Sequence, residues 1–88
     1  MQQSDSDKAL SQLEDVLAQQ RLRHGDNDKR TISTMKDVAR FLKEHSNFEE
    51  ALTMYEKVYE KERKLMGESH PDTLQTMNDI GENSFLRL

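Results

Sequence analysis

Apolar residues recur at intervals of three and four along four segments of the chain, which is the spacing of one face of an α-helix. In the first segment these residues are Ala9, Leu10, Leu13, Val16 and Leu17. Polar residues fill the positions between them, so each segment has an apolar side and a polar side. The pattern predicts four amphipathic helices, at residues 6–23, 29–45, 48–66 and 71–86.

Short polar breaks separate the four segments and contain residues that end or begin helices. Gly25 and Gly67 suit the left-handed conformation with which many helices end. Pro71 suits the first position of a helix, where its missing N–H is no loss. Because the breaks are only a few residues long, we expect consecutive helices to pack antiparallel.

Candidate caps precede three of the helices. Asp26, Asn27 and Asp28 supply turn and N-cap chemistry before the second helix. Ser4, Asp5 and Ser6 offer side-chain oxygens at the predicted start of the first helix. Asn47 followed three residues later by Glu50 resembles a capping box before the third helix.

The second half of the chain repeats the first at a spacing of 42 residues. Aligning Ala9 with Ala51 also aligns Gly25 with Gly67, so one helix face and its stop recur together. Repeated helical pairs bury their faces on one another, which predicts an all-α solenoid. Other identical pairs are Leu10 with Leu52, Val16 with Val58, Thr31 with Thr73, Thr34 with Thr76 and Met35 with Met77.

Three short motifs lie in the second half at fixed places relative to the helices. Residues 48–52 read Phe-Glu-Glu-Ala-Leu, residues 70–74 read His-Pro-Asp-Thr-Leu, and residues 77–81 read Met-Asn-Asp-Ile-Gly. Together with the spacing, they resemble a tetratricopeptide repeat in its long, kinesin-light-chain-like form. The resemblance implies one complete repeat at about residues 28–69, flanked by a second-type helix before it and a first-type helix after it.

Composition narrows the class of protein. The 88 residues predict a single domain, 1–88, with 33% hydrophobic residues, 34% charged residues and a net charge of −4. An acidic chain without an apolar run of about 20 residues predicts neither a nucleic-acid partner nor a membrane partner. The absence of cysteine suits a reducing compartment, and we expect a cytoplasmic protein.

Little in the sequence indicates chemistry. His24, His45 and His70 are far apart and near helix ends, so we predict no metal site. No nucleophile, phosphate-binding loop or paired-acid motif organises the polar residues. We therefore predict no cofactor and no enzymatic activity. The resemblance instead implies a scaffold or adaptor that binds a protein or peptide partner.

One basic stripe is a candidate binding surface. Lys36, Arg40 and Lys43 are spaced at four and three, so they share one face of the second helix. The resemblance implies that this face lines a concave groove, where it could receive an acidic peptide or a C-terminal carboxylate. Asn78 takes the position of Lys36 in the fourth helix, and we include it in this candidate site. The competing interpretation is an ordinary solvated charged face.

The fourth helix is a second candidate surface. About two repeats are fewer than the three or so that a solenoid generally needs, and the last helix has no partner after it. Either the chain belongs to a longer array, or it self-associates as a homodimer or by exchanging helices. The residues predicted to form this exposed interface are Leu74, Met77, Ile80 and Phe85.

Overall fold

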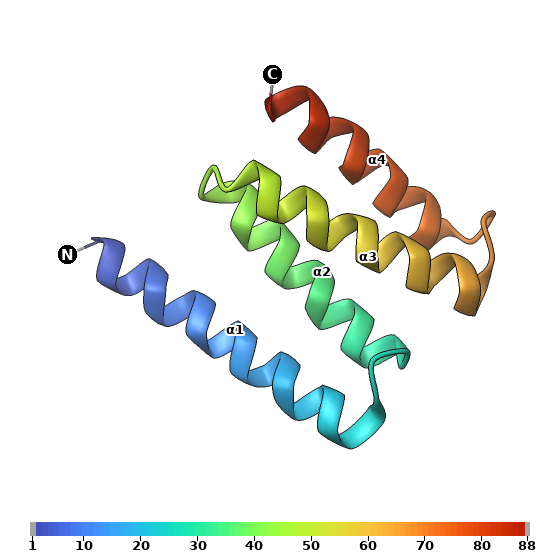
Figure 1. Ribbon diagram of the computed structural model, residues 1–88, viewed down its shortest axis with the longest axis horizontal. Coiled ribbons are helices and arrows are strands. Elements are labelled where there is room, and N and C mark those ends of the chain that lie inside the picture. The colour runs from blue at the N-terminus through green and yellow to red at the C-terminus, as the bar shows by residue number, and fades with distance from the viewer. Residues whose placement is uncertain (1, 88) are drawn as a thin grey trace.

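The computed structural model describes the backbone of residues 2–87 and the side-chain surroundings of residues 7–85. Within this range the chain is helical apart from three short loops, which confirms the all-α prediction. The helices are α1 (Gln2–His24), α2 (Lys29–Glu44), α3 (Phe48–Met66) and α4 (Pro71–Arg87) (Figure 1).

Each helix runs antiparallel to the helix before it, so α1 and α3 share one direction and α2 and α4 share the other (Figure 1). Each also packs mainly against its neighbours in sequence. The result is a flattened array that measures 42 × 36 × 16 Å. Such nearest-neighbour packing is the geometry of a helical repeat protein.

The core lies where α3 packs against α2, with α1 covering the other side of α2. Ala39 and Ala51 are both 0% exposed, which lets α2 and α3 approach closely. Val16 of α1 was expected in the apolar face but is 46% exposed, because α1 packs on a single neighbour. The fully buried apolar residues are Leu17, Ile32, Met35, Val38, Ala39, Leu42, Ala51, Tyr55 and Val58.

The two glycine stops adopt the predicted backbone. Gly25 has a φ of 83° and Gly67 a φ of 94°, a region that favours glycine. After the first stop, the Asp28 side chain accepts a hydrogen bond from the backbone N–H of Arg30 and so caps α2. Its hydrogen bonds to the Arg30 side chain and backbone lower the pKa of the Asp28 carboxyl to about 2.

One expected cap is wrong, and another is right in its position but not in its side-chain bond. The first helix begins at Gln2, so residues 4–6 lie inside it rather than at its N-cap; their side chains fall outside the described range. Asn47 makes no side-chain capping bond to α3. Instead its backbone N–H donates to the carbonyl of Leu42 at 2.8 Å, which ties the turn to the end of α2. Asn47 is still the N-cap residue of α3, because its carbonyl oxygen accepts a hydrogen bond of 2.9 Å from the backbone N–H of Ala51. The backbone of Asn47 therefore serves both helices.

The α2–α3 turn also holds Ser46 at a φ of 65°, a left-handed conformation that costs a residue with a Cβ about 1 kcal/mol. We expect Ser46→Gly to raise the free energy of unfolding by up to about 1 kcal/mol in urea denaturation. Ser33→Gly, at an exposed position inside α2, is the matched control and should lower the free energy of unfolding by about 0.5 kcal/mol. A loss of stability on Ser46→Gly would contradict the assignment of strain to this turn.

Candidate functional site

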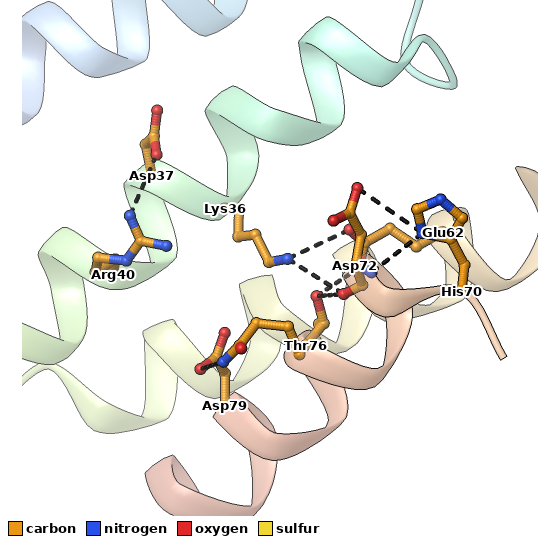
Figure 2. A network of polar contacts seen from close by, with 9 residues as sticks. Lys36, Asp37, Arg40, Glu62, His70, Asp72, Thr76 and Asp79 are labelled. Carbon is orange, nitrogen blue, oxygen red and sulfur yellow. Dashed lines mark hydrogen bonds and ion pairs between the residues drawn. The ribbon is translucent and has the colours of Figure 1, made fainter. Parts of the chain in front are cut away.

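The basic stripe of α2 faces α4. Lys36 reaches across to two groups, with its Nζ 3.4 Å from Oε2 of Glu62 on α3 and 3.3 Å from the backbone carbonyl oxygen of Asp72 on α4 (Figure 2). One ammonium group therefore joins all three helices. The Lys36 side chain is 14% exposed and that of Glu62 only 4%, so water screens this ion pair little.

Glu62 is the centre of this polar network. Its other oxygen, Oε1, accepts a hydrogen bond of 2.5 Å from the hydroxyl of Thr76 on α4. A carboxylate removed from water is tolerated when a cation and hydrogen-bond donors compensate it, and Lys36 and Thr76 supply both. The network thereby fixes the spacing between α2, α3 and α4 at this end of the array.

The other two cations of the stripe have different partners. Lys43 reaches Oε1 of Glu82 on α4 at 2.9 Å, and this hydrogen bond raises the pKa of the lysine. Arg40 pairs with Asp37 of its own helix at 3.7 Å, and both side chains are about half exposed (Figure 2). Arg40 is thus the member of the stripe whose charge is most open to an incoming ligand.

The side of α4 that faces the basic stripe is acidic. Asp79 of α4 accepts a hydrogen bond from the Gln75 amide at 3.2 Å, and Asn78 beside it is exposed. Tyr55 is buried beneath, and burial together with the charge of Asp79 raises the pKa of its phenol. Basic side chains of α2 thus face acidic side chains of α4, and the phenol of Tyr55 lies buried near both.

A cavity of about 400 Å³ lies at the start of α2, and Lys36 and Glu62 are part of its lining. Lys29 and Arg30 stand on one side of it and Asp72 on the other, while Met66 supplies an apolar contact.

The second candidate surface, on α4, is largely open. Leu74 is 50% exposed, Met77 48% and Phe85 74%, whereas Ile80 is partly buried and packs against the core. Met77 and Ile80 also line a hollow of about 530 Å³ beside Tyr59 of α3. The side chains of Leu86 and Leu88 lie outside the described residues.

The helix pairs repeat in contact as well as in sequence. In the first copy the Thr34 hydroxyl donates to the side-chain oxygen of Gln20, and in the second copy Thr76 donates to Glu62. Each residue of the second pair lies 42 positions after its counterpart. A family model described as tetratricopeptide repeat matches residues 1–64. The chain belongs to the tetratricopeptide repeat family.

The match shows the family but not which form of the repeat the chain adopts. It ends at residue 64, before the His-Pro-Asp-Thr-Leu loop, so the long kinesin-light-chain-like form stays a prediction. A comparison with curated proteins found no match. Tetratricopeptide repeats are generally protein–protein interaction modules and typically non-catalytic scaffolds. The absence of enzymatic activity in this chain stays a prediction.

Two of the three histidines make contacts beside a helix end. His45 follows α2 and stacks on the Phe41 ring, with its Nδ1 2.9 Å from the Phe41 carbonyl oxygen. His70 precedes α4, and its Nδ1 accepts a hydrogen bond of 3.1 Å from the backbone N–H of Asp72. Among the residues searched, no group of three His, Cys, Asp or Glu side chains could hold a metal ion. Within the same described range, none of the helices is both long and apolar enough to span a membrane.

Sequence reasoning missed Glu62 and Thr76, which organise the network. Glu62 looks like one of many charged residues on an exposed helix face, because a helical pattern does not show which polar position a neighbouring helix will cover. The threonine pairs of the 42-residue repeat were a usable signal. Thr31, Thr34, Thr73 and Thr76 are all buried against the preceding second-type helix.

Proposed function

We propose that this tetratricopeptide chain is an interaction module that binds an extended acidic peptide in the groove between α2 and α4. The exposed guanidinium of Arg40 carries the proposal, because it stands in the groove with only a long ion pair to Asp37. An incoming carboxylate can replace that partner in a bidentate geometry. Lys43 lies one turn further along and adds positive charge.

The dimensions of the groove suit a short segment. A helix of 16 residues such as α2 is about 24 Å long, which an extended chain covers with about seven residues. The exposed Asn78 on the facing helix can hydrogen-bond a peptide backbone. Lys36 has a different role in this proposal. Its ammonium is paired with Glu62, so Lys36 keeps the helices around the groove at a fixed spacing and does not contact the ligand.

The acidic side chains of α4 set the specificity. Asp79 and Glu82 disfavour a peptide that is acidic along both edges, so a preferred ligand carries carboxylates on the side facing α2. The cysteine-free composition suits binding in a reducing compartment, and we keep the cytoplasmic placement as part of the proposal.

The test uses an array of synthetic peptides of about seven residues, with acidic, basic and neutral members and with free or amidated C-termini. We expect the purified chain to retain acidic members, and Arg40→Ala to weaken their binding about tenfold. Arg63→Ala is the matched control, because Arg63 also pairs with a carboxylate three residues earlier, Glu60, but on α3.

Equal retention of basic and acidic peptides would contradict the proposal. So would an Arg40→Ala variant that binds acidic peptides as tightly as the Arg63→Ala variant does. Lys36 is left unchanged in these variants because altering it would disturb the buried Glu62 and confuse a folding defect with a binding defect.

A further inference from the structure

The apolar face of α4 has a buried counterpart inside the same chain. At a spacing of 42 residues, Leu74, Met77 and Ile80 correspond to Ile32, Met35 and Val38 of α2. The three residues of α2 are each at most 3% exposed, whereas Leu74 and Met77 are about half exposed. The difference arises because α3 covers α2, while the described residues contain no helix that covers this face of α4.

The residues with which α3 covers α2 also have counterparts, and these lie at the other end of the molecule on α1. Ala51 and Val58 of α3 are fully buried. Ala9 and Val16 of α1 occupy the same positions, carry the same side chains and are partly or largely exposed. The described residues of α1 and α4 therefore carry two open faces whose side chains match those of the internal α2–α3 interface.

We propose that α1 of a second copy covers α4, so that copies join head to tail and each junction reproduces the α2–α3 pair. In this arrangement Val16 of one molecule enters the hollow beside Met77 and Ile80 of another. Gly81 takes the place of Ala39 at the close approach, and a smaller residue there admits the second helix without a clash.

At the proposed junction, uncharged amide side chains take the positions of the internal ion pair. Lys36 on α2 pairs with Glu62 on α3; the residues at these positions of the junction are Asn78 on α4 and Gln20 on the second copy's α1. An amide pair thus replaces an ion pair, and neither side brings an unpaired charge into the contact. Gln20 keeps its bond to Thr34, as Glu62 keeps its bond to Thr76.

The junction uses different surfaces on the two molecules, so it does not close on itself as a symmetric dimer does. The assemblies should therefore grow beyond two copies as the protein concentration rises. Phe85 lies outside the junction, because its counterpart Lys43 points toward the next first-type helix and not toward α3. The junction shares Asn78 with the peptide groove proposed between α2 and α4, and the other residues named for the two surfaces differ.

Analytical ultracentrifugation of the full 88-residue chain tests the proposal. We expect the weight-average mass to rise with concentration past twice the monomer mass of 10.3 kDa. Val16→Glu blocks one face and Met77→Glu the other, so each variant alone should be monomeric. An equimolar mixture of the two should form a complex that stops at two chains, because one open face remains on each.

Two measurements distinguish a folding defect from a loss of association. Both substituted side chains are about half exposed, so helicity and thermal unfolding should match those of the monomeric wild type at low concentration. Gly81→Ala is the matched control on the same face; it places at the junction the residue that α2 has there, and it should leave association intact.

A wild-type chain that stays monomeric at millimolar concentration would overturn the proposal. A Val16→Glu variant that still dimerises would overturn it too, since that result indicates a symmetric contact between two α4 helices. A mixture of the two variants that remains monomeric would have the same consequence.

Discussion

Lys36→Met is expected to lower the free energy of unfolding by about 3 kcal/mol, because it leaves the Glu62 carboxylate buried without its cation. The methionine retains most of the apolar stem of lysine, so the loss reports the charge and not the packing. Urea denaturation followed by circular dichroism measures it. For a chain of this size, such a loss is a large fraction of the total stability.

The double variant Lys36→Met with Glu62→Gln should recover most of that loss. The first copy of the repeat shows why, since Gln20 occupies the position of Glu62 there and accepts the equivalent threonine hydroxyl. Lys43→Met is the matched single control. Its partner Glu82 is half exposed, so that variant should lose no more than about 1 kcal/mol.

If Lys36→Met and Lys43→Met lost the same stability, the buried network would not have the role assigned to it. An unfolded double variant would contradict the assignment equally, because removing both charges should relieve the cost of burying either one.

Tyr55→Ala is expected to cost about 3–5 kcal/mol, the largest effect of any single truncation in this chain. The ring is 1% exposed and lies between α2 and α4, where the charges of Lys43 and Asp79 both influence the pKa of its phenol. Its removal leaves a cavity at the junction of three helices, which their mutual packing prevents from closing. Calorimetric or urea unfolding measures the loss.

Tyr59→Ala provides the matched control, because Tyr59 is the same residue type on the same helix but only partly buried. We expect it to cost about half as much. Tyr55→Phe should stay close to the wild type, since it keeps the ring. Equal losses for the two alanine variants would show that α4 does not pack over Tyr55 as described.

The predicted features were those that depend on residues near one another in the chain. The periodic apolar residues placed α2 and α3 within one residue of their observed ends. Gly25 and Gly67 indicated two of the turns, because a positive φ is a local requirement. The 42-residue repeat identified the all-α repeat architecture.

The candidate site was harder to predict. The stripe of Lys36, Arg40 and Lys43 follows from helical spacing, but its pairing with Glu62 and Glu82 does not. A single helix shows which residues share a face; it does not show which charges a neighbouring helix brings to that face. Asn47 was correctly expected at the start of α3, but the side-chain bond of the expected capping box does not form.

The sequence by itself determined the helices, their order and the repeat, since these depend on periodicity and backbone preference. The tertiary structure decided which polar residues became part of the interior. Glu62 is buried because Lys36 of α2 and Thr76 of α4 compensate its charge, and these residues are 26 and 14 positions away from it. It also decided that Val16 and Met77, with the same apolar character as their buried counterparts, remain exposed. Burial depends on which helices lie beside a residue, and that is a property of the assembled array.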